Sequence, residues 1–287
     1  MYICGVLEVE ENTMSQENGF RINVDNILKA KAPKYYHRIP RFLINYLKRT
    51  LHQDDINGIL SRNSEAKGVE FMRALVEKEF CLSLEIRGEE NIPESGKFTF
   101  ASNHPLGGLD GICLSAYLGT KYDGKIKYLV NDVLYFIDPL KPIFVPINKY
   151  GAQGKESAKA INEAYASTNQ IITFPAGLCS RKIKGKIIDL DWMKNFIIKS
   201  VEYQRDVIPV HFEGKNSAFF YNFSNLRKAS GLKFNIELIY LPDEMFKNSH
   251  RQFTITFGQS IPWQTFDKSK TPQEWAQYVK DMAYAMK

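Results

Sequence analysis

A histidine and an aspartate have the residue types and spacing of a general-base pair. His104 follows a short apolar run that ends at Ala101, and Asp110 lies six residues beyond it. If that run is a strand of an open α/β sheet, both residues lie at its carboxyl end, where such sheets carry their chemistry. Pro105 and Gly107-Gly108 allow the chain to turn between them. An ionised Asp110 in the first turn of the next helix would bind one imidazole nitrogen and raise the basicity of the other.

The backbone beside this pair has a second chemical use. Gly107 and Gly108 carry no side chains, so their N–H groups could approach an oxyanion that develops on a substrate. The remaining histidines are interpreted as structural: His37, His52, His211 and His250.

The elements that would position the pair are indicated from about residue 95 onward. Short β-rich runs alternate there with helical stretches, which predicts an α/β domain with a largely parallel, buried sheet. Thr271-Pro272-Gln273-Glu274 is a capping box that opens a last helix. The expected strands are 98–101, 126–130, 143–147, 170–174, 207–212, 234–240 and 253–257, and the expected helices between them are 110–118, 155–167, 190–203 and 217–229.

Residues 20–84 have a different pattern, typical of short helices interrupted by prolines. Between Lys29 and Arg49 there are seven basic residues and no acidic one. A basic amphipathic helix is typical of a segment on an anionic membrane surface. The alternative is a helix packed on the main domain with its charges in water, and the sequence leaves both open. The predicted membrane contacts are Lys34, Arg38, Arg41, Phe42, Leu43 and Tyr46.

Composition excludes several classes of protein. The chain has 287 residues, of which 44% are hydrophobic and 24% charged, so it is neither disordered, fibrous nor a coiled coil. Its net charge of +6 is small for a protein that coats nucleic acid, and no nucleic-acid motif is present. We therefore predict no nucleic-acid partner.

Neither the cysteines nor the N-terminus indicates export. Cys4, Cys81, Cys113 and Cys179 form no Cys-x-x-Cys pair and lie near no histidine at zinc-ligand spacing. We predict no metal site and a reduced, cytosolic protein.

No run reaches about 18 apolar residues, and the first 13 residues lack the basic flank of a signal peptide. They are interpreted as a mis-assigned start before Met14 or as an unstructured tail, so we expect a disordered tail at 1–19, a helical region at 20–84 and the α/β domain at 85–287.

Three sequence blocks resemble the glycerophosphate/lysophosphatidate acyltransferase superfamily in content and order. They are Asn103-His104 with Asp110, Phe174-Pro175-Ala176-Gly177 with Ser180-Arg181, and Val207-Ile208-Pro209-Val210. The resemblance covers roughly residues 85–265 and implies an acyltransferase-type sheet flanked by helices. Three departures count against a lysophosphatidate acceptor. Five residues rather than four separate the histidine and aspartate, and Ala176 and Asn148 replace the Glu and Arg that hold glycerol phosphate in the superfamily.

The whole pattern is most similar to the bacterial branch labelled hemolysin-like. Phe212-Glu213-Gly214-Lys215-Asn216-Ser217 matches a further block of that branch. The branch includes N-acyltransferases that make glycine and ornithine lipids. The resemblance therefore implies transfer of a (3-hydroxy)acyl chain from acyl carrier protein, or from coenzyme A, to the amino group of glycine or ornithine. His104 would be the base and Asp110 would orient it, with no bound cofactor, at the inner face of the cytoplasmic membrane.

The same resemblance suggests which residues meet the substrates. Arg181 could clamp the acceptor's carboxylate, and Lys182, Lys184 and Lys186 could receive the carrier protein or its phosphopantetheine; a solvated loop is the alternative. Cys179 and the aromatic residues of 219–223 are interpreted as packing. Two other functions remain open: a 1-acylglycerol-3-phosphate O-acyltransferase and a non-catalytic membrane-binding protein. The predicted substrate-binding residues are Asn103, Gly107, Gly108, Gly177, Ser180, Arg181, Glu213 and Lys215.

Overall fold

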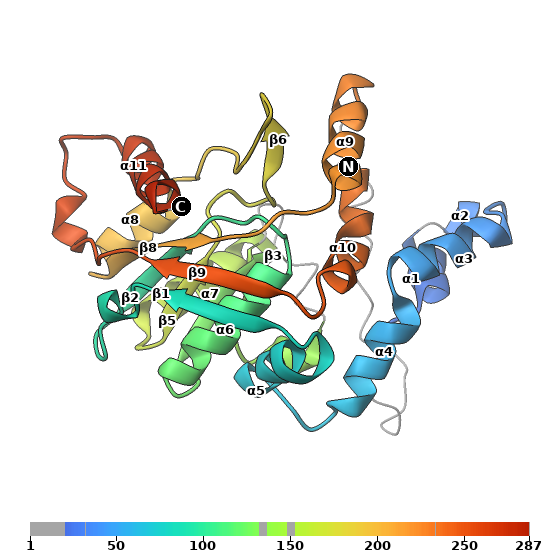
Figure 1. Ribbon diagram of the computed structural model, residues 1–287, viewed down its shortest axis with the longest axis horizontal. Helices are drawn as coiled ribbons and strands as arrows, with labels where there is room; N and C mark the ends of the chain where they lie inside the picture. Colours follow the sequence, from blue (N-terminus) through green and yellow to red (C-terminus); the bar gives the residue numbers. More distant parts are fainter. Residues whose placement is uncertain (1–20, 32, 132–136, 148–152, 233, 287) are drawn as a thin grey trace.

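A seven-stranded sheet of order β1-β9-β8-β2-β5-β3-β4 forms the centre of the molecule (Figure 1). The computed structural model describes residues 21–31, 33–131, 137–147, 153–232 and 234–286. β8, β2, β5, β3 and β4 are mutually parallel, whereas β9 pairs antiparallel with β8 and parallel with β1. The predicted α/β class with a largely parallel sheet and an N-terminal helical region is confirmed. The strands are β1 Ser83–Arg87, β2 Phe98–Ser102, β3 Ile126–Asn131, β4 Phe144–Ile147, β5 Gln170–Thr173, β8 Asp206–Phe212 and β9 Gln252–Phe257.

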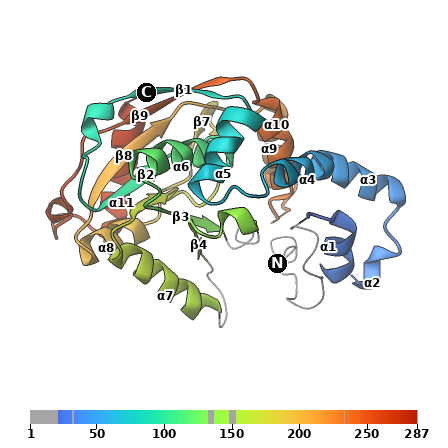
Figure 2. The same ribbon diagram turned by 90° about the horizontal axis from the view of Figure 1, so that it is seen from below.

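Helices cover both faces of this sheet (Figure 2). Side chains alternate along each strand, so Phe100 and Ile172 pack with α5 and α6, whereas Ala101 and Ile171 lie on the opposite face with α7, α8 and α11. Burial on both faces explains why the parallel strands are continuous apolar runs in the sequence. These helices are α5 Val69–Ala74, α6 Leu109–Lys121, α7 Gln153–Ala166, α8 Asn195–Glu202 and α11 Pro272–Ala285, and α5 continues as the π-helical turn η1 Leu75–Glu79.

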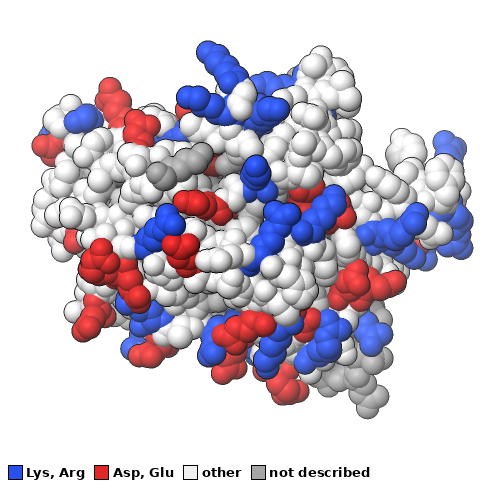
Figure 3. Space-filling model, in the orientation of Figure 1, with Lys and Arg blue, Asp and Glu red and all other residues white. Residues whose placement is uncertain are grey.

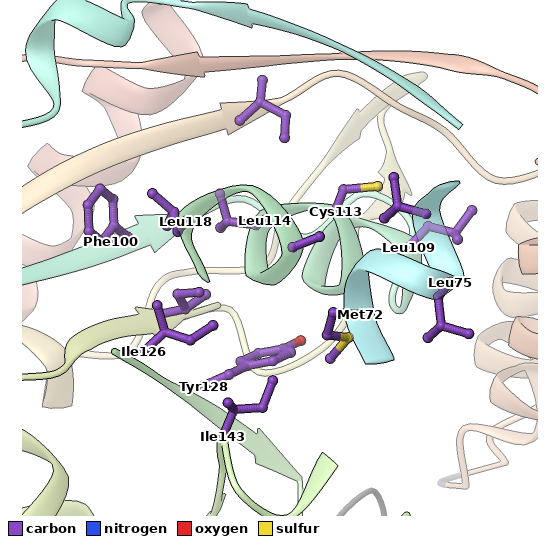
Figure 4. Packing of buried hydrophobic residues seen from close by; sticks show 14 of the residues in the cluster. Met72, Leu75, Phe100, Leu109, Cys113, Leu114, Leu118, Ile126, Tyr128 and Ile143 are labelled. Carbon is purple, nitrogen blue, oxygen red and sulfur yellow. The ribbon is translucent and has the colours of Figure 1, made fainter. Parts of the chain in front are cut away.

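The packing of α6 fixes the start of that helix at the carboxyl edge of the sheet. Leu109, Cys113, Leu114 and Leu118 are completely buried along one side of it and meet Phe100 and the neighbouring strands (Figure 4). Burying one such leucine stabilises the fold by about 1.5–3 kcal/mol. The first turn of α6, which carries Asp110, is therefore held rigidly beside the end of β2.

The N-terminal helices form an arm, here residues 21–62, that lies beside α10 Leu241–Lys247 (Figure 1). His52 stacks on Phe246 of α10 with ring centroids 4.2 Å apart, and its Nε2 lies 3.3 Å from Asp243. The hydroxyls of Tyr46 and Tyr240 are 2.7 Å apart. The arm therefore contacts the α/β domain through the short helix α10 and the 3-10 turn before it, and also through Ile59 and Leu60, which join the main core cluster. Its helices are α1 Val24–Lys31, α2 Pro33–Tyr36, α3 Arg41–Thr50 and α4 Gln53–Arg62.

One predicted strand is wrong. Residues 236–240 form a 3-10 helix, η5 Ile236–Tyr240, which runs directly into α10. The alternating apolar residues satisfied the strand pattern, but Pro242 at the start of α10 favours a helix and Glu237 is completely buried in an ion-pair cluster. Here tertiary contacts override local strand propensity.

Smaller differences concern the hairpin and the helix ends. The sequence did not predict β1 or the hairpin of β6 Arg181–Ile183 and β7 Lys186–Ile188. The helix expected at 190–203 begins only at Asn195, whereas the predicted capping box of Thr271 and Glu274 is present. The remaining elements are η2 Glu89–Asn91, η4 Asp138–Leu140, α9 Ala218–Ala229 and η6 Trp263–Thr265.

Some predictions fall outside the described residues. These are the expected tail at 1–19, with Cys4 and both candidate starts, and Asn148. Among the helices that the structure describes, none is long and apolar enough to cross a membrane.

Candidate active site

His104 and Asp110 lie together at the carboxyl end of β2. β2 ends at Ser102, the chain turns through residues 104–108, and α6 begins at Leu109. The imidazole Nδ1 of His104 is 3.0 Å from the Oδ2 of Asp110. The Asp110 side chain is completely buried, whereas 15% of the His104 side chain stays exposed. Because Asp110 occupies Nδ1, Nε2 is the nitrogen that can take a proton from a substrate.

Backbone donors hold the Asp110 carboxylate in its ionised form. Oδ2 accepts hydrogen bonds from the N–H groups of Leu106 (2.9 Å) and Gly107 (3.3 Å), and Oδ1 accepts one from Gly111 (2.9 Å). Burial alone would raise the pKa of Asp110. The imidazole of His104 and these N–H groups outweigh burial, so the pKa is lowered. The turn thus provides a buried anion directed at His104.

The environment makes His104 a stronger base than an ordinary histidine. Burial by itself lowers its pKa, but the charge of Asp110 and the hydrogen bond to it, helped by the charge of Asp189, raise the pKa above the usual value. Arg181 opposes this with a smaller effect. The aromatic ring of Phe174 packs against the imidazole at 4.3 Å between centroids.

Asp189, which sequence analysis missed, holds the main chain of His104. Its two carboxylate oxygens are each 3.2 Å from the backbone nitrogen of His104. Ser180 donates its hydroxyl to Asp189 at 2.6 Å and its backbone N–H to the His104 carbonyl at 2.7 Å. A carboxylate directly after the short apolar run Ile187-Ile188 is the signal that could have indicated this residue.

Several predicted substrate-binding side chains instead bond inside the protein. The amide of Asn103 accepts from the N–H of Phe212 (2.6 Å) and donates to its carbonyl (3.0 Å), which joins the ends of β2 and β8. Ser180 is 1% exposed, and its hydroxyl donates a hydrogen bond to Asp189. The structure thus gives Asn103 and Ser180 a positioning geometry, and contact of either with substrate stays a prediction.

Arg181 belongs to a buried cluster of two guanidinium groups around one carboxylate. Its Nη2 is 3.2 Å from Glu237, and its Nη1 donates to the carbonyl and Sγ of Cys179. Arg227 contacts the other oxygen of Glu237 at 3.0 Å. The cluster has a surplus of one positive charge, but a clamp by Arg181 on an acceptor carboxylate would compete with these bonds, so that role also stays a prediction.

The other predicted residues are more open or belong to turns. Glu213 is partly exposed, with Arg87 3.8 Å away, and Lys215 is exposed. Gly177 has a left-handed backbone in the turn after β5, and the N–H of Gly107 already donates to Asp110. Gly108 precedes α6 as its N-cap. Contact of these residues with substrate stays a prediction.

Cys179 is a packing residue near the site. It is 2% exposed, and burial raises the pKa of its thiol to about 11, so little thiolate forms near neutral pH. Within the described ranges, no group of three or more His, Cys, Asp or Glu side chains is arranged to hold a metal ion.

Replacing Gly107 with alanine is expected to destabilise the turn and lower activity. Gly107 has φ +77°, and an added Cβ would lie 3.0 Å from the Cβ of Cys179 and 3.1 Å from Leu241. The left-handed backbone alone costs about 1–2 kcal/mol for alanine, and crowding adds to this. Gly185→Ala is the matched control, because Gly185 has φ +82° and an added Cβ would meet no atom within 4 Å. Thermal unfolding should show a larger loss for Gly107→Ala; equal losses would contradict a crowded turn.

Sequence comparison relates this chain to known acyltransferases. The family model described as "Acyltransferase" matches residues 26–287. The lyso-glycine lipid O-acyltransferase of Bacteroides thetaiotaomicron is 54% identical over 273 residues, which cover 95% of this chain and 100% of that protein. The enzyme of the same name from Phocaeicola vulgatus is 52% identical, covering 95% and 98%.

A solved structure is also similar at low identity. The 1-acyl-sn-glycerophosphate (LPA) acyltransferase from Thermotoga maritima matches with a TM-score of 0.49 and 14% identity, over 76% of this chain and 79% of that one. The family match spans most of the sequence and includes the His104–Asp110 turn. The chain belongs to the acyltransferase family and is an acyltransferase.

Proposed function

We propose that this protein transfers an acyl group from a thioester to a hydroxyl of a lyso-glycine lipid, with His104 as the general base. The observation that carries the proposal is the Nδ1–Oδ2 bond of His104 and Asp110 in a chain more than half identical to two lyso-glycine lipid O-acyltransferases. The sequence predicted the amino group of glycine or ornithine as the acceptor. The names of the relatives favour an oxygen acceptor on a lipid that already contains glycine. Glycine has no hydroxyl apart from its carboxyl group, so the hydroxyl would belong to the acyl chain, as a 3-hydroxyacyl group provides.

The reaction then needs one proton transfer in each direction. Nε2 of His104 takes the hydroxyl proton as the oxygen attacks the thioester carbonyl carbon. The buried carboxylate of Asp110 stabilises the imidazolium that forms. The C–S bond breaks, and the leaving thiolate takes the proton back from Nε2. No covalent acyl-enzyme is needed, which agrees with the raised thiol pKa of Cys179.

The hairpin of β6 and β7 is suited to receive an acidic acyl donor. Lys182, Lys184 and Lys186 are all exposed on it, and basic side chains gather over β6 in the space-filling view (Figure 3). Arg181, at the base of the hairpin, is close enough to affect the pKa of His104. Positive charge beside the base fits the phosphate of phosphopantetheine or the surface of acyl carrier protein, with coenzyme A as the alternative donor.

The N-terminal arm is suited to bring the protein to an anionic membrane. Phe42 (74% exposed), Leu43 and Tyr46 (each 41%) project from α3, although Ile44 on the same helix is buried. Lysine and arginine side chains gather around α2 and α3 (Figure 3), and Lys34, Arg38 and Arg41 are exposed. Apolar side chains flanked by basic ones favour an anionic lipid surface.

The position of the arm links this surface to the site. α10 contacts the arm through Phe246, while Leu241 and Met245 of the same helix lie against Gly107 and Gly108. A lipid acceptor in the membrane would thus be close to the His104 turn. We propose peripheral attachment at the inner face of the cytoplasmic membrane, where carrier-bound acyl chains and a lipid product can both be handled.

Replacing Phe42 with serine is expected to weaken binding to anionic vesicles without destabilising the protein. The side chain is 74% exposed, so the fold loses little, whereas a lipid-inserted phenylalanine contributes about 1.5–3 kcal/mol. Co-sedimentation with phosphatidylglycerol vesicles measures the effect. Ile198→Ser is the control, because Ile198 is 40% exposed on α8, at the opposite end of the molecule from α3 (Figure 1). Equal binding of parent and Phe42→Ser would contradict contact through α3.

Lipid analysis tests the acceptor directly. A bacterial host that is supplied with lyso-glycine lipid expresses either this chain or its His104→Ala variant, and lipid extracts are compared by mass spectrometry. A doubly acylated glycine lipid that appears only with His104 supports the proposal. Singly acylated glycine formed in hosts given no lyso lipid would instead identify an N-acyltransferase. Rescue of a strain that lacks lysophosphatidate acyltransferase, without any glycine lipid, would identify lysophosphatidate as the acceptor.

A further inference from the structure

The site contains a second buried carboxylate that the His104–Asp110 mechanism does not use. Asp189 is 1% exposed and follows β7, whereas Asp110 stands on α6. Asp110 bonds the imidazole, and Asp189 bonds the backbone nitrogen of the same residue at 3.2 Å from both oxygens. His104 therefore lies between two carboxylates from different elements.

The bonds around Asp189 are more numerous than a chain turn requires. Its oxygens also accept from the hydroxyl of Ser180 (2.6 Å) and from Nε1 of Trp192 (3.0 Å), and Trp192 is completely buried. On the main-chain side, the Asp189 N–H donates to the Tyr284 hydroxyl (2.8 Å) and its carbonyl accepts from Lys280 (3.0 Å). Helix α11 thus holds the main chain of Asp189, while its side chain bonds His104.

We propose that Asp189 is a positioning residue for acyl transfer: it fixes the main chain of His104 and adds a second negative charge that stabilises the imidazolium formed during the reaction. The proposal rests on the proposed function in that His104 acts as the base. Hydrogen bonds from Ser180, Trp192 and the main chain of His104 favour the ionised carboxylate. The single N–H of His104 lies between both carboxylate oxygens, which fixes the main chain that carries the imidazole.

The charged groups around His104 show how Asp189 affects the pKa of the imidazole. Asp110 on α6 and Asp189 after β7 both raise the pKa of the imidazole, while burial and Arg181 on β6 lower it. Burial also raises the pKa of Asp189, and the hydrogen bonds from Ser180 and Trp192 and the charge of the imidazole oppose that rise without cancelling it. Removing the charge of Asp189 alone should therefore leave His104 a weaker base, protonated only at lower pH.

Asp189→Asn is designed to remove the charge and keep most of the bonds. Its amide oxygen can replace Oδ2, which accepts from Trp192 and His104. The amide nitrogen takes the place of Oδ1, where it donates to the rotated hydroxyl of Ser180 and gives up one of the two contacts with the His104 N–H. Asp191→Asn is the matched control, because Asp191 lies two residues away with an 88% exposed side chain.

The first measurement is the NMR titration of the His104 imidazole in protein labelled at histidine, assigned with His104→Ala. We expect His104 to titrate at lower pH in Asp189→Asn than in the parent, and at the parent's pH in Asp191→Asn. Steady-state kinetics should then show a kcat lowered by up to about 100-fold with little change in KM. An unchanged titration in folded Asp189→Asn overturns the proposal. The titration needs no substrate, so a parent that acylates another acceptor counts against the proposed function and not against Asp189.

A second variant covers the case in which Asp189→Asn does not fold. Ser180→Ala removes the 2.6 Å hydroxyl bond to Asp189 and keeps the carboxylate. If Ser180 and Asp189 position His104, kcat falls and the KM values of both substrates stay the same. A raised KM with an unchanged kcat would make Ser180 a substrate contact and would overturn the coupling through Asp189.

Discussion

Replacement of His104 by alanine is expected to lower kcat by about 10²- to 10⁴-fold, the usual contribution of a general base. The imidazole is the group beside the buried Asp110 that can take the acceptor's proton. In the variant, water would have to act as the base in its place. The fold should survive, because the main-chain bonds of residue 104 to Asp189 and Ser180 do not involve the imidazole. Thiol release from an acyl thioester, together with thermal unfolding, measures both properties.

His37→Ala provides the control for this variant. His37 is exposed in the N-terminal arm, before α3, so its loss should leave kcat unchanged. Turnover by folded His104→Ala at the parent's rate would exclude His104 as the base and leave the His104–Asp110 pair as a structural contact.

The His104–Asp110 pair could be predicted because its geometry is local. His104 follows a buried strand, Gly107 allows a left-handed turn, and Asp110 stands in the first turn of α6, all within one short segment. The five mutually parallel strands were predicted for a similar reason, since burial on both faces gives each of them a continuous apolar run. Neither prediction needed any knowledge of distant contacts.

The features that the sequence did not reveal depend on such contacts. Asp189 reaches His104 only because the β6–β7 hairpin returns the chain to the site, and α11, about 90 residues later, holds it there. Asn103 and Ser180 sit within recognised motifs, but the folded chain turns both side chains inward. A motif therefore identified the neighbourhood of the site without separating residues that face substrate from those that support His104.

The strand predicted at 234–240 was wrong for a related reason. Its apolar residues alternate, but the polar residue between them, Glu237, is buried between Arg181 and Arg227. A buried carboxylate with two charged partners determines the local structure more strongly than an alternating pattern does. Only the tertiary fold shows which partners are present.

Asp110→Asn is the second substitution with a large expected effect, and its consequence differs from that of removing the imidazole. Three donors converge on Oδ2 of Asp110: Nδ1–H of His104 and the N–H groups of Leu106 and Gly107. The amide oxygen of asparagine must therefore take that position, because an NH₂ group there would face three donors. The His104 tautomer is kept, while the amide nitrogen meets the N–H of Gly111 and loses one hydrogen bond. The lost bond should cost about 1–3 kcal/mol of stability.

The main effect on catalysis is then the loss of the negative charge. The pKa of His104 is raised by Asp110, and neutral His104 is the active base, so activity falls as pH falls through that pKa. Without the charge the pKa drops and the acid limb of the kcat profile moves to lower pH. The plateau falls roughly 10- to 100-fold, because the imidazole is a weaker base. Asp123→Asn, at an exposed turn, is the control and should leave the acid limb and the plateau of the kcat profile unchanged. An acid limb at the parent's pH in folded Asp110→Asn would mean that the carboxylate's charge does not act on His104, and its role would then be to order the turn.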